Sequence, residues 1–120
     1  MDLAESEEIT GLRDTLRRFV AKECTPEAID AWDRNDHIPR EMALKLADLG
    51  VCGACVPEAY GGMGRQVVAM SVVLDELARG SAALATLYCM NACYGGLNIS
   101  ESGTEEQKRR LLPDLLAGKS

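Results

Sequence analysis

No apolar run in the sequence approaches the ~20 residues that a membrane-spanning helix needs, and internal repeats and low-complexity tracts are missing as well. The sequence has a single histidine, His37, in a polar stretch with no serine or cysteine partner at a recognisable spacing. A histidine-activated nucleophile is therefore not expected. The 120 residues, 47% of them hydrophobic, suffice for one compact globular domain with its own core.

Basic residues are outnumbered, because 13 Lys and Arg stand against 19 Asp and Glu and give a net charge of −6. This charge repels phosphate backbones and anionic membrane surfaces, so no nucleic-acid partner and no membrane insertion are expected. The short cluster at residues 108–110 is interpreted as a solvated helix face. The acidic N-terminus, with Glu7 and Glu8, is unlike a secretion or transit signal, and a cytoplasmic location is the expectation.

The five cysteines form an odd set in a chain without a secretion signal, which predicts reduced thiols rather than a disulfide framework. A zinc site built from Cys52, Cys55, Cys89 and Cys93 is the alternative. The surroundings lack the Gly- and Lys-rich character of a zinc knuckle, and the second pair lies on a predicted helix. We therefore expect no metal and interpret the cysteines as small buried hydrophobes.

Helical spacing of apolar residues predicts a long helix over residues 5–23. Thr25 is a typical N-cap and is followed by proline, so a second, shorter helix is expected over 26–33. A third helix is expected to start at Pro39 and to end at Gly50, which suits a C-cap.

A fourth helix is expected from Gln66 to Gly80, with Asp75 on its apolar stripe. Because a buried carboxylate needs a partner, Arg79 at i+4 is the local candidate. The predicted stripe consists of Val67, Val68, Ser71, Leu74, Asp75 and Ala78.

Ser81 is expected to cap a fifth helix that runs through Asn98 and carries few charges on any side, which indicates a central position. Glycines at 95 and 96 predict a kink or a close neighbour. Thr104 and Gln107 form a capping box for a last helix, which Pro113 should end. About six helices and no convincing strand predict an all-α fold, an orthogonal or up-down helical bundle.

The loop Pro57–Gly64 contains three glycines but is not a dinucleotide-binding fingerprint. That fingerprint is G-x-G-x-x-G after a strand, and Val67 stands where the third glycine belongs. The glycines allow positive φ and a close approach of a ligand or a neighbouring domain.

The order of these parts resembles the N-terminal helical domain of acyl-CoA dehydrogenases over essentially the whole chain. The resemblance is carried by the long first helix and by several short segments in this order: Ile38-Pro39, Leu49-Gly50, Pro57–Gly64, Leu74–Gly80, Gly103–Lys108 and Leu112-Pro113.

The resemblance implies that residues 1–120 are one domain of a larger FAD-dependent oxidoreductase of fatty acid metabolism, with a β-rich middle domain and a C-terminal helical domain outside this sequence. Such enzymes remove an α-proton from an acyl-CoA thioester and pass a β-hydride to the flavin. Electrons then go to an electron-transferring flavoprotein, and the family is usually homo-oligomeric. The base belongs to the missing segments, so no catalytic residue is expected here.

In the family, a helix equivalent to the fifth lines the acyl pocket. The resemblance therefore implies that six residues bind substrate: Ala85, Thr86, Cys89, Met90 and Cys93 on the helix, and Tyr60 in the glycine loop. It assigns no flavin-binding residue. The segment 92–94 differs in bulk and polarity from common members, which leaves the acyl group open.

Two alternatives remain at this point. A related flavin oxidase or monooxygenase shares this helical domain but passes electrons to oxygen. A stand-alone helical interaction module would keep the bundle as a binding surface without catalysis.

Overall fold

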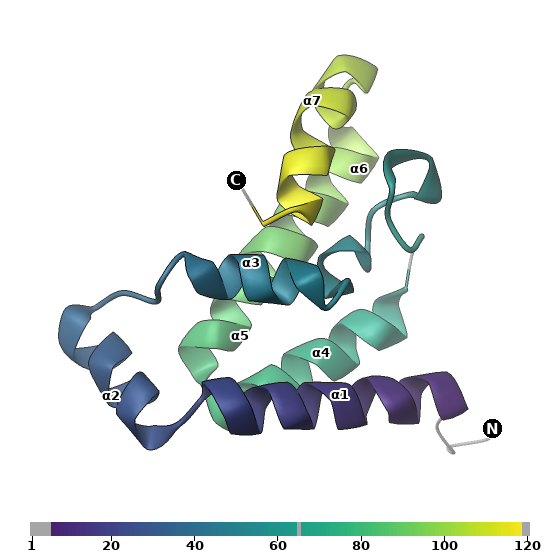
Figure 1. Cartoon of the computed structure of the whole chain (residues 1–120). Coiled ribbons are helices and arrows are strands. Elements are labelled where there is room, and N and C mark those ends of the chain that lie inside the picture. The colour runs from purple at the N-terminus through teal and green to yellow at the C-terminus, as the bar shows by residue number, and fades with distance from the viewer. Residues whose placement is uncertain (1–5, 65, 119–120) are drawn as a thin grey trace.

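A computed structural model describes residues 6–64 and 66–118. These residues contain no strand, which confirms the all-α class, and none of their helices is both long and apolar enough to cross a membrane. The elements are α1 (Glu7–Glu23), α2 (Pro26–Asn35), α3 (Glu41–Asp48), α4 (Val67–Gly80), α5 (Ala82–Tyr88), a π-helical segment (Cys89–Leu97), α6 (Asn98–Ser102) and α7 (Glu105–Leu116), with 3₁₀ turns at Val51–Gly53 and Glu58–Tyr60 (Figure 1).

Helix α5, the π-helical segment and α6 form one continuous helix, which we call the long helix. Its backbone stays right-handed helical at both junctions, with φ −62° and ψ −44° at Tyr88 and φ −64° and ψ −43° at Asn98. The irregularity expected near the paired glycines is thus a widening of the helix. A Cβ on Gly95 would lie 2.8 Å from Leu115 Cδ1. A close approach of α7 therefore accounts for this glycine.

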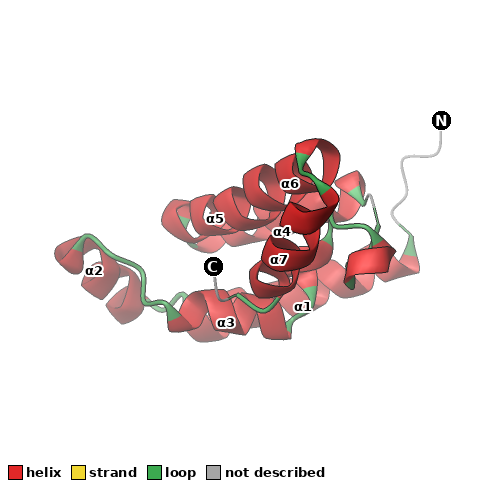
Figure 2. Ribbon diagram, turned by 90° about the horizontal axis from the view of Figure 1, so that it is seen from above, coloured by secondary structure: helices red, strands yellow, loops and turns green. Residues whose placement is uncertain are grey.

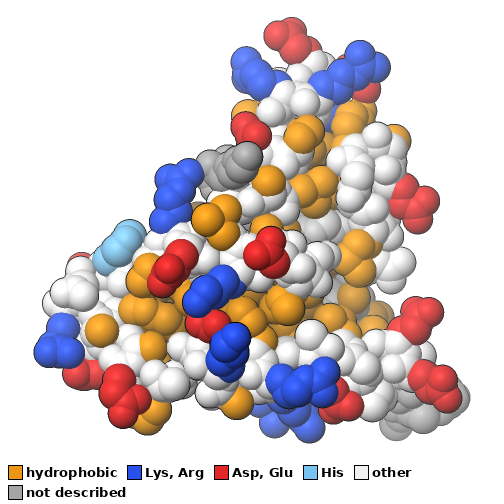
Figure 3. Space-filling model, in the orientation of Figure 1, with side chains coloured by type: hydrophobic (Ala, Val, Ile, Leu, Met, Phe, Trp, Pro, Cys, Tyr) orange, Lys and Arg blue, Asp and Glu red, His pale blue; other side chains and the backbone are white. Residues whose placement is uncertain are grey.

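The domain is a slab of 43 × 40 × 19 Å, about two helices thick. Helices α1 and α4 lie side by side, and the long helix leaves the end of α4 toward α7 (Figures 1 and 2). The larger apolar core lies among α1, α3, α4 and α5, and a smaller one joins Val56 to Leu112 and Leu115 of α7. Figure 3 shows apolar side chains in view between α3 and α1.

The predicted caps hold, but several helix ends differ from the prediction: α2 runs to Asn35, α3 begins at Glu41, and the long helix continues past Asn98 to Ser102. The Thr25 hydroxyl accepts the Ala28 N–H at 3.1 Å, and the capping box of Thr104 and Gln107 is closed in both directions. Gly50 adopts φ 79° after α3. Helix α7, however, continues through Pro113 to Leu116. The lost N–H falls on an exposed position, while buried residues on either side keep the helix packed.

The prediction of which face of α4 is buried was wrong, because the helix is rotated about its axis relative to the expected orientation. Val67 and Val68 are 46% and 67% exposed, and Asp75 is exposed as well. The buried face consists of Ala69, Val72, Val73, Glu76 and Leu77. Both faces of α4 are apolar enough to pass for the buried one, so periodicity alone does not choose between them.

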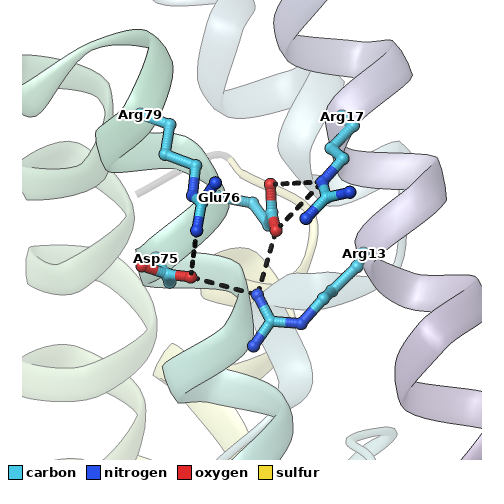
Figure 4. Close-up of polar contacts among 5 residues, drawn as sticks. All are labelled: Arg13, Arg17, Asp75, Glu76 and Arg79. Atoms are coloured by element: carbon cyan, nitrogen blue, oxygen red, sulfur yellow. Dashed lines mark hydrogen bonds and ion pairs between the residues drawn. The ribbon is translucent and has the colours of Figure 1, made fainter. Parts of the chain in front are cut away.

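The buried carboxylate of α4 is Glu76, whose side chain is 1% exposed and is held by two arginines of α1 (Figure 4). Arg13 Nη1 donates to Glu76 Oε1 at 2.9 Å, and Arg17 Nε lies 3.3 Å from both carboxylate oxygens. Asp75 pairs with Arg79, as predicted, at 3.6 Å and also with Arg13 at 3.0 Å. The expected ion pair therefore exists, but on the exposed side.

Burial acts to raise the pKa of the Glu76 carboxyl. Hydrogen bonds from Arg13 and Arg17, with the charges of Arg17 and Arg79, outweigh burial and hold this pKa below its usual value of 4.5. The ionised carboxylate is thus the form that the fold stabilises.

Replacing Glu76 with glutamine should lower the free energy of unfolding by about 3 kcal/mol, because it removes the buried charge that holds Arg17 and leaves Arg13 with Asp75 as its acidic partner. The matched variant Asp75→Asn removes a carboxylate that is 50% exposed and should cost less than about 1 kcal/mol. Urea unfolding followed by circular dichroism at neutral pH measures both. Equal losses in the two variants would contradict the special role of Glu76.

The pH dependence gives a second readout of the same pair. Because the pKa of Glu76 is lower in the folded state, its stabilising effect is complete above about pH 4.5 and is lost as the pH falls through the folded-state value. The difference between the wild type and Glu76→Gln should therefore shrink on acidification. A difference that stays constant down to about pH 3 would show that packing, not charge, is responsible.

Gly80, at the end of α4, sits against α1, since a Cβ there would lie 2.4 Å from Val20 Cγ1. Gly80→Ala should therefore destabilise the domain by about 1–3 kcal/mol through overpacking, although alanine is the better helix former. Gly11 of α1 has no such neighbour within 4 Å, so Gly11→Ala should stabilise it by about 0.5–1 kcal/mol. Thermal unfolding should show shifts of opposite sign, and a stabilised Gly80→Ala would contradict the close contact.

Candidate functional site

The long helix carries no Asp, Glu, Lys or Arg from Ser81 to Ser100, and its residues divide between two faces. Ala85 and Cys93 are buried against the rest of the domain. Met90 and Tyr94, four residues apart, are 58% and 59% exposed. Thr86 is also exposed, and its hydroxyl donates to the Ala82 carbonyl at 2.9 Å. We call Thr86, Met90 and Tyr94 the outward face; it is uncharged and lacks a covering layer within the described residues.

The inner side of the long helix is lined with thiols. Burial raises the pKa of Cys93 to about 12, with further contributions from Cys89 and Cys55, and burial raises that of Cys52 to about 11. Cys55 Sγ lies 3.3 Å from the Met70 sulfur. All five cysteines are free, and in the described part of the chain no three His, Cys, Asp or Glu side chains are placed to hold a metal ion. These thiols act as small apolar side chains.

Tyr88 fixes the long helix to the segment that leads into the glycine loop. Its side chain is fully buried, and its hydroxyl donates to the Val51 carbonyl at 2.9 Å. Burial, with the nearby thiols, raises the pKa of this phenol. The hydroxyl thus stays protonated and remains a hydrogen-bond donor.

The glycine loop folds back on its own backbone. Met63 N–H donates to the Gly53 carbonyl at 2.9 Å, and Gly64 N–H donates to the Val56 carbonyl at 2.9 Å. A Cβ on Gly62 would lie 2.1 Å from that Val56 oxygen, so glycine is required there. The close backbone contact that the glycines permit is therefore a contact between the loop and the preceding residues 53–56 of the same chain.

Tyr60, the loop residue expected to bind substrate, belongs to the smaller core, whereas Ala85 belongs to the larger one. Tyr60 packs with the smaller core beside Leu112, and its hydroxyl donates to Glu105 Oε1 at the start of α7. This hydrogen bond is the main cause of the raised pKa of Tyr60 and the lowered pKa of Glu105. The structure thus places Tyr60 where it ties the glycine loop to α7.

A groove of about 400 Å³ separates the glycine loop from the end of the long helix. Its size is within the range of small-molecule sites. Its lining residues are Cys55, Pro57, Glu58, Gly64, Leu97, Ser100 and Glu101, of which two are charged and both of those are carboxylates. Both charged side chains among the described lining residues are therefore acidic, and Glu101 also takes part in a contact within the chain.

Comparison with known proteins identifies the architecture. The family model described as "Acyl-CoA dehydrogenase, N-terminal domain" matches residues 6–119. The chain belongs to the acyl-CoA dehydrogenase family. This result confirms the resemblance inferred from the order of its sequence segments.

Curated relatives extend well beyond the matched region. A glutaryl-CoA dehydrogenase of Desulfococcus multivorans is 36% identical over 118 residues, which cover 96% of this chain and 30% of that protein. An acyl-CoA dehydrogenase of Bacillus subtilis (strain 168) is 34% identical, with 89% and 28% covered. A (2S)-methylsuccinyl-CoA dehydrogenase of Cereibacter sphaeroides is 36% identical, with 93% and 20% covered. The chain thus spans less than a third of the length of these dehydrogenases.

A solved structure is similar to this chain in fold as well as in sequence. The structure of a glutaryl-coenzyme A dehydrogenase glutaryl-CoA complex superposes with a TM-score of 0.85 at 34% identity, covering 99% of this chain and 31% of that one. The flat architecture of this acyl-CoA dehydrogenase domain is therefore that of a domain within a larger enzyme.

Residue patterns alone did not identify Tyr94 as part of the outward face of this acyl-CoA dehydrogenase domain. The available signal was its spacing of four residues from Met90 in a helix without charges. Glu58 and Glu101, which border the groove, were also missed, because they come together only when the loop folds beside α6.

The flavin implied by the family does not fit the described residues. The Asn91 Oδ1 atom is buried without a hydrogen-bond partner, but the cavity it lines measures about 10 Å³, room for one water at most. The described lining of the larger groove offers no basic side chain to hold the pyrophosphate of FAD. We therefore assign no flavin contact to these residues.

The buried thiols should resist alkylation, because the thiolate is the reactive form and burial disfavours it. With pKa values of about 11 and 12, Cys52 and Cys93 should react with iodoacetamide near pH 8 at least about tenfold more slowly in the native protein than in urea. Peptide mass spectrometry follows each site separately. Equal rates in both states would contradict the burial of these side chains.

Proposed function

We propose that residues 1–120 are the N-terminal domain of an FAD-dependent acyl-CoA dehydrogenase that introduces an α,β double bond into an acyl-CoA thioester. The domain's part is to supply one wall of the acyl site. The observation that carries the proposal is the long helix, which is uncharged from Ser81 to Ser100 and exposes Met90 and Tyr94.

An exposed apolar face on a helix without charges is suited to bind a ligand or another domain. Family membership and the coverage of under a third of the relatives' length support a ligand that lies between this domain and a further part of the same polypeptide. Burial of a hydrocarbon tail against such a wall is worth ~0.8 kcal/mol per methylene.

The residues assigned to the wall are Ala85, Thr86, Cys89, Met90 and Cys93, with Tyr94 added from the structure. Thr86, Met90 and Tyr94 contribute exposed surface, whereas Ala85 and Cys93 set the packing beneath it. Their role is to orient the acyl chain and to exclude water from the reacting carbons. Tyr60 supports the neighbouring glycine loop, and none of these residues has a chemical role in bond making.

The flavin and the base that removes the α-proton are proposed to lie in the remainder of the polypeptide, in a β-rich middle domain and a C-terminal helical domain. FAD supplies the redox chemistry when it is bound there. A homo-oligomer, an electron-transferring flavoprotein as acceptor, a cytoplasmic location and a place in fatty acid metabolism complete the proposal.

The test is to express the complete open reading frame that contains these 120 residues and to record its visible spectrum with and without acyl-CoA. A flavin spectrum that bleaches on anaerobic addition of acyl-CoA, with formation of the 2-enoyl thioester, is expected. A colourless protein that stays a stable monomer and binds no acyl-CoA would overturn the proposal.

Within that enzyme, Cys89→Phe should shift the preference toward shorter acyl chains, because the added ring fills space beside the wall. The matched control Ala21→Phe adds similar bulk on the exposed side of α1 and should leave the chain-length profile unchanged. The measurement is kcat/KM over a series of straight-chain acyl-CoA substrates. An unchanged profile in Cys89→Phe would remove Cys89 from the wall.

A further inference from the structure

Helix α2 stands apart from the packed part of the domain. In the described chain, the closely packed helix pairs join α1 to α4, α4 to α5 and α6 to α7, whereas α2 belongs to none of them. It lies at one end of the slab, beyond the end of α1 (Figures 1 and 2). Segments with so little packing are those that open locally at a low cost in free energy.

One side chain fastens α2 to the core. Trp32, which is 8% exposed, is the single buried residue in this helix, all of which is described. The partly buried Ala28 and Ile29 pack beside it against the larger core. The ion pair of Arg34 with Asp30, at 3.1 Å, lies within the helix itself. The attachment of α2 is therefore apolar and centred on Trp32.

The chain on either side of α2 is fixed independently of this helix. Glu23 at the end of α1 and Lys45 of α3 form an ion pair at 2.8 Å, which joins the helices before and after α2. Cys24 and Ile38, which flank α2, pack against the larger core. Movement of α2 away from the core therefore does not require α1 and α3 to separate.

The two connections of α2 suit a hinge. Cys24 has φ −95° and ψ 54°, outside the regular helical region, and Asp36 has φ 51°. Asp36 is the one non-glycine residue with positive φ in the described part of the chain, and this conformation costs free energy for a residue with a Cβ. Opening releases this strain, so the strain lowers the cost of opening.

Helix α2 also forms one wall of a surface groove. A groove of about 220 Å³ is lined by Trp32 and Asp33 of α2, by residues 36–38 and by Ala83 of α5. A second groove, of about 410 Å³, continues from His37 and Ile38 to Leu87 of α5. Because α2 is the outer wall of the smaller groove, its movement would uncover the start of α5.

We propose that residues 25–37 form a strap that opens as one unit, with Trp32 as its latch, while α1, α3 and α4 stay folded. The strap controls access to the start of α5 and to the core surface that Trp32 covers. This device is independent of the proposed acyl wall and does not rest on the dehydrogenase function.

Hydrogen exchange of the complete protein, followed by peptide mass spectrometry, tests the strap. The amides of α2 should be at least about 100-fold less protected than those of α1 and α4, and their opening should depend weakly on urea because it exposes little surface. Equal protection of α2 and of the two packed helices would overturn the proposal.

Shortening the latch should act on α2 alone. Trp32→Phe and Trp32→Ala should lower the protection of α2 in steps, by about tenfold or more for alanine, and leave α1 and α4 unchanged. The matched control Leu16→Ala, in the fully buried core of α1, should instead lower protection throughout the domain.

Two results of the latch variants would overturn the proposal. Unchanged protection of α2 in both variants would show that Trp32 is not the latch. Protection lost equally from α1, α4 and α2 would show that α2 is not a separate unit. Trp32→Phe gives this comparison even where the alanine variant fails to fold, because most of the apolar contact is kept.

Discussion

The ion pair between the Glu76 carboxylate and the arginines of α1 is the constraint on which the rest of the domain depends. A fully buried carboxylate is tolerated only in the one rotation of α4 that brings it to Arg13 and Arg17. That rotation turns one apolar face of α4 into the core and the other outward. Because the long helix starts two residues after Gly80, its direction follows from the same rotation. The uncharged outward face is thus positioned by a contact far from it along the sequence.

The thinness of the slab determines which surfaces stay open. With an extent of 19 Å in one direction, a helix packed on one side by its neighbours has no layer to cover its other side. This explains how α4 and the long helix both combine a buried apolar face with an exposed one. A thicker, closed bundle of the same helices would bury Met90 and Tyr94 and leave no apolar wall. The exposed surfaces are therefore a property of the architecture rather than of single residues.

The parts of the fold that could be predicted from sequence are those whose signals lie within about four residues. The caps at Thr25, Gly50 and Thr104 are of this kind, and they predicted the starts of α2 and α7 and the end of α3. The inward face of α4 was mispredicted because α1, a remote segment, selects it. The expected helix end at Pro113 failed for a similar reason, since packing of α7 outweighs one missing hydrogen bond. For the candidate site, the helix was predictable, but its division into buried and exposed faces was not.

The π-helical segment Cys89–Leu97 has a consequence for how the domain tolerates changes in length. A π-helix accommodates a residue beyond the α-helical repeat, so loss of one residue between these ends would return the segment to α-helical hydrogen bonding without opening a loop. Because the wide turns take up the extra residue, the helix beyond the deletion would keep nearly its present direction, and Leu97 and Ser100 would still lie beside the glycine loop. Loss of a single codon would thus change the hydrogen bonding of the long helix without moving the groove at its end.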